Sequence, residues 1–187
     1  YNQTVYQNLK LKANAKYSLS FWIKGNPNYG RFFVSDVTDD PIDAWKQHNE
    51  DLAKRCAYLN SLGIETLEYR SSNGTNFRVG MMELGEFKGG GDTSLQGIYF
   101  NPNIPTEECF ISPKKGEAEG IVYSSMPWCY RGQIIDKFFM RFENGKVVEA
   151  GAERGEDVLN TVLDMDEGAR YLGECALVPF DSPINQT

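Results

Sequence analysis

Between residues 40 and 63 the hydrophobic positions recur with the spacing of an α-helix. The apolar positions on this stretch are Ile42, Trp45, Leu52, Cys56 and Leu59. Asp40-Pro41 suits a helix start, because aspartate caps free backbone N–H groups and proline fits the first helical position. Gly63 supplies the stop. The pattern predicts an amphipathic helix of about five or six turns.

A strand is predicted directly after this helix. Residues 64–69 alternate between two faces, with Leu67 and Tyr69 on one of them and Thr66 and Glu68 on the other. A helix followed at once by a strand indicates an α/β unit, which we assign to residues 1–75.

From residue 76 onward the pattern changes to short runs typical of β-strands. The runs cover residues 77–82, 97–100, 109–112, 120–126 and 133–142. Asn144-Gly145 separates the last run from Val147-Val148, which is the signature of a type I′ hairpin. We expect these runs to form a curled, barrel-like antiparallel sheet.

The end of the chain predicts one more helix and one more strand. Residues 155–163 carry apolar positions at helical spacing, with acidic residues at the favourable N-terminal end. A strand over Glu174 to Val178 follows. The fold class is therefore α+β, with an α/β portion in residues 1–75 and a β-rich portion in residues 76–187.

Composition excludes some classes of partner. There are 26 acidic and 19 basic residues, so the net charge of −7 repels phosphate backbones and we expect no nucleic acid. No stretch approaches the roughly 20 consecutive apolar residues of a membrane helix, so we expect a soluble protein without a membrane partner.

The four cysteines are widely spaced and form no CxxC pair. Cys56, Cys109, Cys129 and Cys175 each sit in an apolar or aromatic run. We interpret them as reduced, buried thiols of a cytoplasmic protein.

Two features that suggest chemistry have simpler interpretations. Gly89-Gly90-Gly91 lacks the flanking strand, helix and lysine of a phosphate-binding loop, so a flexible turn is favoured. His48 is the only histidine, so it would have to serve any Ser-His-Asp or Cys-His site alone. A partly exposed packing role on the helix is favoured instead.

Carboxylates are the remaining candidates for chemistry. Two prolines just ahead of Glu107 and Glu108 stiffen the backbone, which suits a carboxylate held ready for a cation, although on this stretch alone an acidic strand entrance on the surface is favoured. Glu174 is embedded in an apolar run, where a lone carboxylate is costly unless it is paired or metal-bound. An ion pair with Arg170 is the alternative to a metal.

Four motifs together resemble the thermophilic aminopeptidase family, also called the aminopeptidase T family, of dinuclear metallopeptidases. They are DPIDAW at 40–45, GTNF at 74–77, NIPTEECF at 103–110 and DEGARYLGE at 166–174. The second departs from the Gly-Thr-Asp-Leu of the family, and the third has cysteine in place of valine. Each motif is short, but all four occur in the family's order.

The resemblance implies a set of metal ligands. The second glutamate of NIPTEE and the last glutamate of DEGARYLGE are ligands in that family, which here are Glu108 and Glu174. Glu107 is then a neighbour and not a ligand. The family completes its site with a histidine, a tyrosine and a His-x-Asp element further on, beyond residue 187, and His48 lies in the wrong motif to replace them.

The implied activity is removal of N-terminal amino acids from peptides, with two divalent ions (zinc, cobalt or manganese) per subunit of a homodimer. Whether Glu174 bridges the metals or acts as base stays open. Both chain ends are abrupt, so we expect a fragment that binds metal weakly or not at all and does not turn over peptides alone.

Two other classes of function compete with this interpretation. One is a noncatalytic structural or binding module in which Glu108 and Glu174 are ordinary surface residues. The other is a glycosidase that uses a pair of carboxylates, but the proline and glycine pattern around these residues is not typical of glycosidases.

Overall fold

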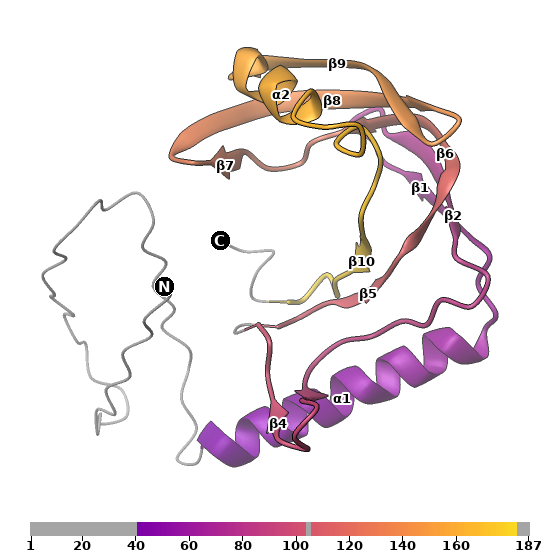
Figure 1. Ribbon diagram of the computed structural model, residues 1–187, viewed down its shortest axis with the longest axis vertical. Coiled ribbons are helices and arrows are strands. Elements are labelled where there is room, and N and C mark those ends of the chain that lie inside the picture. Colours follow the sequence, from indigo (N-terminus) through magenta and orange to yellow (C-terminus); the bar gives the residue numbers. More distant parts are fainter. Residues whose placement is uncertain (1–40, 104–105, 183–187) are drawn as a thin grey trace, which may run out of the picture. The chain divides into compact units, whose positions relative to one another are not determined.

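The predicted amphipathic helix is present as α1, Pro41–Ser61 (Figure 1). The computed structural model describes residues 41–103 and 106–182, which all belong to one unit, residues 31–187. Gly63 follows the helix with a φ of 60°, as a glycine that ends a helix does. The predicted cap at Asp40 lies outside the described residues.

The packed part of α1 is its second half. Leu52 and Cys56 are only 1% and 7% exposed. Ile42 was predicted on the same face and is 69% exposed, so that prediction is wrong. The reason is position along the helix: Ile42 lies in the first turn of α1, whereas the buried Leu52 and Cys56 lie in its second half.

The remaining elements are mostly strands, with one further helix, α2. The strands before the long hairpin are β1 (Thr66–Arg70), β2 (Asn76–Met81), β3 (Asp92–Thr93), β4 (Tyr99–Phe100), β5 (Cys109–Ile111), β6 (Pro113–Tyr123) and β7 (Trp128–Tyr130). They are followed by β8 (Gln133–Glu143), β9 (Lys146–Arg154), α2 (Glu156–Leu163) and β10 (Cys175–Leu177).

The main sheet has the order β1-β2-β6-β8, with β7 and β9 both paired to β8. Each of its pairings is antiparallel, which confirms the predicted α+β class. The pairs β5-β10 and β3-β4 form two small antiparallel ladders beside it. β1 and β2 lie on either side of residue 75 and pair with each other. The division of the chain into two portions at residue 75 stays a prediction.

Side chains from the sheet and from α2 build one core. Val79 and Ile135 on the sheet and Leu159 on α2 are fully buried, and α2 contacts β8 and β9 (Figure 1). Burying such a side chain contributes about 1.5–3 kcal/mol. The apolar periodicity of residues 155–163 thus predicted both the helix and its buried face.

Two strand predictions missed part of the sheet. β6 starts at Pro113 rather than at residue 120, because its first half is charged and exposed where the prediction relied on apolar alternation. Lys114 there pairs with Glu83 and Glu117 instead of packing in the core. The short edge strand β7 was not predicted. Neither described helix is both long and apolar enough to span a bilayer.

The thiols agree with the sequence interpretation at three of four positions. All four cysteines are free, and Cys56, Cys109 and Cys175 are buried. Cys129 is exposed, so its predicted burial is wrong. Cys129 pairs with Ile134 in the β7–β8 ladder, and alternation turns both away from the face that carries buried Ile135.

Thiol reactivity should follow this division. Burial raises the pKa of Cys109 to about 12, which removes the reactive thiolate. We expect iodoacetamide at pH 8 to modify one site, Cys129, in the native chain and four sites in urea, measured by intact mass. Cys129→Ser is the control that should show no fast modification. Rapid native labelling of Cys109 would contradict the buried position of β5.

The β8–β9 turn is the tight hairpin that the sequence predicts. Asn144 and Gly145 have φ angles of 50° and 79°, as both central residues of a type I′ turn do. A Cβ at Gly145 would also collide with the backbone of Gly116.

We therefore expect Gly145→Ala to destabilise the chain more than Gly97→Ala does. Gly97 has a nearly identical φ of 78° with open space around it, so its substitution isolates the backbone strain, about 1–2 kcal/mol. The collision at Gly145 should add about 1–3 kcal/mol. Urea denaturation of both variants measures the difference in the free energy of unfolding. Equal losses of stability would show that the backbone at Gly116 moves aside at little cost.

Candidate functional site

Glu108 lies immediately before β5, at the edge of the core. The next residue, Cys109, is 3% exposed, and Ile111 is 4% exposed, so these two side chains face inward. Side chains alternate along a strand, so Glu108 is on the opposite face together with Phe110. The carboxylate is half-buried.

Glu174 occupies the equivalent place before β10. β10 pairs antiparallel with β5, with Cys175 opposite Ile111 and Ala176 opposite Phe110. Because Cys175 is buried, Glu174 falls on the face of Ala176. Alternation therefore places the two predicted ligands, which are far apart in the sequence, on the same face of one small sheet, just beyond its two opposite ends.

Glu174 influences Glu108 electrostatically. Burial raises the pKa of Glu108 above its usual value, and the nearby negative charge of Glu174 raises it further. No hydrogen bond or ion pair among the described residues involves either carboxylate. A cation bound near Glu108 would offset both effects, because it favours the charged form of the carboxylate.

The ion pair considered as the alternative for Glu174 is not formed. Arg170 Nη2 lies 2.6 Å from Asp164 Oδ1, and Arg170 Nη1 donates to the Val147 carbonyl at 3.1 Å. Glu174 itself is exposed, so the expectation of a carboxylate embedded in an apolar strand is wrong. The apolar neighbours of Glu174 turn inward, and alternation leaves Glu174 in solvent.

The pair fits part of a metal site and not a whole one. Carboxylate oxygens are donors that zinc and manganese accept, and both lie on one face. Among residues 41–103 and 106–182, no three His, Cys, Asp or Glu side chains are grouped to hold an ion. A site built on this pair needs further donors.

Glu107 and His48 are engaged with each other and with the backbone. Ser182 Oγ donates to Glu107 Oε2 at 3.0 Å, and His48 Nε2 lies 3.4 Å from Glu107 Oε1. His48 Nε2 also lies 2.7 Å from the carbonyl oxygen of Thr106. These contacts agree with a partly exposed packing role for His48. No local sequence pattern marks Ser182, and the sequence analysis missed it.

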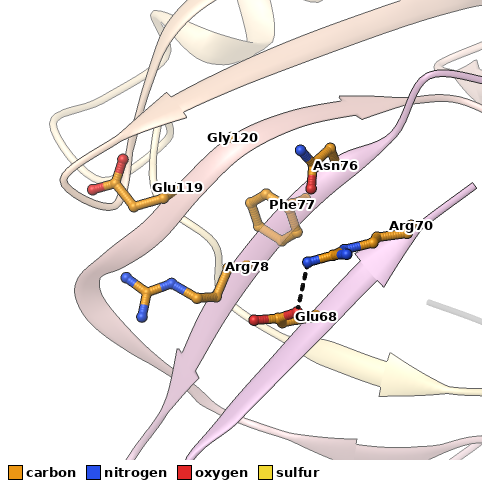
Figure 2. A pocket seen from close by; sticks show the side chains of 7 residues that line it. All are labelled: Glu68, Arg70, Asn76, Phe77, Arg78, Glu119 and Gly120. Atoms are coloured by element: carbon orange, nitrogen blue, oxygen red, sulfur yellow. Dashed lines mark hydrogen bonds and ion pairs between the residues drawn. The ribbon is translucent and has the colours of Figure 1, made fainter.

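A shallow depression of about 190 Å³ lies elsewhere, on the exposed face of β1, β2 and β6 (Figure 2). Arg78 stands there in register between Glu68 and Glu119 of the neighbouring strands. Alternating charges across strands are a usual way to cover a solvated sheet face. Neither Glu108 nor Glu174 lines this depression, so we do not assign the chemistry to it.

The influence of Glu174 on the pKa of Glu108 predicts the effect of removing the Glu174 charge. In Glu174→Gln the pKa of Glu108 should fall toward its usual value. A carboxyl pKa that is raised in the folded state stabilises the fold below the unfolded pKa, near 4.5, and this stabilisation is lost as pH rises through the folded pKa. The difference in the free energy of unfolding between pH 4 and pH 7 should therefore be smaller in Glu174→Gln than in the unmodified chain.

Carbon-13 NMR titration of the Glu108 carboxyl and thermal melts at both pH values measure this effect. Glu68→Gln removes an exposed carboxylate from a different sheet and should leave the Glu108 titration unchanged. An unchanged titration in Glu174→Gln would mean that the two carboxylates are too far apart to share a ligand.

Comparison with known proteins places the chain in a family. The family model described as thermophilic metalloprotease (M29) matches residues 32–187. Aminopeptidase T of Thermus aquaticus is 44% identical over 149 residues, which are 80% of this chain and 36% of that protein. Aminopeptidase AmpS of Bacillus subtilis (strain 168) is 40% identical over 149 residues, 80% of this chain and 36% of the relative.

A solved structure agrees with the sequence comparisons. Wild-type AmpT from Thermus thermophilus superposes with a TM-score of 0.73 at 44% identity, covering 78% of this chain and 36% of that one. This chain thus spans about a third of the length of the relatives it matches. The resemblance seen in the four motifs is confirmed, and the chain belongs to the thermophilic metalloprotease (M29) family.

Proposed function

We propose that Glu108 and Glu174 are two carboxylate ligands in the metal site of an aminopeptidase that removes N-terminal amino acids from peptides. The observation that carries this proposal is the β5–β10 ladder, which sets both glutamates on one face. Membership in a family of metalloproteases supports a metal-binding role for the pair.

The names of the relatives support the substrate class. Aminopeptidase T of Thermus aquaticus and aminopeptidase 2 of Geobacillus stearothermophilus are 44% and 45% identical to this chain. Both extend well beyond the part that this chain matches, at 36% and 35% of their length. The donors that Glu108 and Glu174 lack are therefore proposed to lie in that further part.

We propose that the full-length subunit holds two divalent ions, of zinc, cobalt or manganese, with Glu108 and Glu174 among their ligands. Such ions, when bound, lower the pKa of a coordinated water and polarise the scissile carbonyl. The residues of this chain contribute hard oxygen donors and a negative field that attracts the free ammonium group of a peptide substrate. Half-burial of Glu108 strengthens its attraction to a cation, because less water screens the charge.

Two further parts of the proposal concern the whole protein. A homodimer is proposed from the family resemblance. A cytoplasmic location is proposed because the four cysteines are free, as thiols are in a reducing compartment.

Cation binding by the chain is the direct test. We expect weak binding of Mn²⁺, measured by loss of the free-ion signal in electron paramagnetic resonance. Glu108→Gln and Glu174→Gln should each weaken binding by at least about tenfold, because even outer partners of a metal site contribute that much. Glu86→Gln is the control, since Glu86 is exposed and pairs with Lys88. Equal binding by all four proteins would favour the noncatalytic module.

Activity is tested in a chimera. Residues 41–182 of this chain replace the matching segment of aminopeptidase T of Thermus thermophilus, which is 45% identical over 149 residues. With Co²⁺ or Zn²⁺ the chimera should hydrolyse leucine p-nitroanilide, its Glu108→Gln variant should not, and this chain alone should not. A chimera that stays fully active without Glu108 would refute the ligand assignment.

A further inference from the structure

Three segments of the chain meet at the peptide just before Glu108. α1 contributes His48, the strand entrance contributes Thr106 and Glu107, and the segment after β10 contributes Ser182. Thr106 and Ser182 are 6% and 3% exposed, so this meeting point is inside the fold. Such burial of polar groups is tolerated when their hydrogen bonds are made, as they are here.

His48 holds the backbone on one side. A carbonyl oxygen can only accept a hydrogen bond, so His48 Nε2, at 2.7 Å from the Thr106 oxygen, carries the proton and donates it. The ring is itself oriented by Trp45, which meets it edge-on with centroids 5.3 Å apart. The bond therefore joins a rigid helix to the residue two positions before Glu108.

Glu107 is held on the other side. Its Oε2 accepts from Ser182, and its Oε1 faces His48 Nε2 at 3.4 Å. The side chain is 14% exposed, so this carboxylate depends on these two partners for most of its solvation. With its oxygens directed at Ser182 and His48, Glu107 has a role separate from that of a ligand.

The backbone of Glu108 is also supported from the connection between β2 and β3. Lys88 and Phe110 exchange two backbone hydrogen bonds of 2.8 Å. Gly89 packs so close that a Cβ there would collide with the carbonyl oxygen of Glu108. The glycine triplet therefore supplies close backbone contact at this position, and not only the freedom of a turn.

Rigid support is needed because Glu108 lies just before β5 and outside the β5–β10 ladder. The ladder hydrogen bonds therefore do not fix Glu108 by themselves, and its backbone depends on neighbouring contacts. A ligand acts well only when its backbone and rotamer are fixed near the productive geometry by surrounding residues.

We propose that His48, Glu107 and Ser182 form a clamp whose function is to position Glu108 for a divalent cation. This inference rests on the proposed function of Glu108. In this role His48 and Glu107 are positioning residues, and the Ser182 hydroxyl ties the segment after β10 to the same point. The contacts of the clamp link α1 to the entrance of β5 and to the segment after β10.

The test compares variants that remove one bond each. His48→Leu keeps the bulk and removes the N–H donor, His48→Gln keeps a donor, and Ser182→Ala removes the hydroxyl. Asn73→Leu is the control, because Asn73 hydrogen-bonds the Tyr123 carbonyl and the Thr75 amide in the main sheet and makes no bond to the clamp or to residues 87–89. Glu108→Gln is the reference for loss of a ligand.

Two measurements are made on the 187-residue chain. The first is the order parameter of the Glu108 amide from nitrogen-15 relaxation, without metal. We expect a fall from about 0.85 to below about 0.6 in His48→Leu and Ser182→Ala, and recovery in His48→Gln. The second is Mn²⁺ affinity, which should fall by about 10–100-fold in the same two variants. Asn73→Leu should melt earlier and keep both properties.

The outcomes separate the clamp from the proposed function. If Glu108→Gln loses Mn²⁺ while His48→Leu and Ser182→Ala keep both a rigid Glu108 amide and normal affinity, the clamp is refuted and the ligand assignment stands. If Glu108→Gln binds Mn²⁺ like the unmodified chain, the proposed function fails. Loss of affinity in Asn73→Leu would show that any loosening of the fold acts the same way, which also overturns the clamp.

Discussion

The antiparallel pairing of β5 with β10 is the contact on which the candidate site depends. Each strand is only three residues long, yet each begins directly after one of the two glutamates. Buried Cys109 and Cys175 hold the ladder against the core, so the residues before them are turned outward together. The same inward side chains thus stabilise the fold and aim the carboxylates.

Local patterns predicted most of the elements. The helix at 41–61, the hairpin at Asn144-Gly145 and the helix at 156–163 follow from periodicity and turn chemistry that act within a few residues. The two wrong predictions of burial have one physical origin. Ile42 and Cys129 are apolar by type, but burial depends on what covers a position, and that is decided by partners distant in sequence.

The site was predictable in a different way. Glu108 and Glu174 were found through short motifs, whereas their common face depends on a strand register that no local pattern specifies. Glu174 also lies in an apolar run and is nevertheless exposed, because alternation and not average hydropathy sets its environment. Ser182 could be found only in three dimensions, since a single serine carries no periodic signal.

The position of β10 in the chain has a consequence for biosynthesis. β10 comes after the whole main sheet and α2, so a ribosome has made every other described strand before the partner of β5 emerges. Contacts between such distant segments form late, since the loop between them must first close. Until then β5 has no partner strand, so the two carboxylates come to share one face only at the end of synthesis of the described part of the chain.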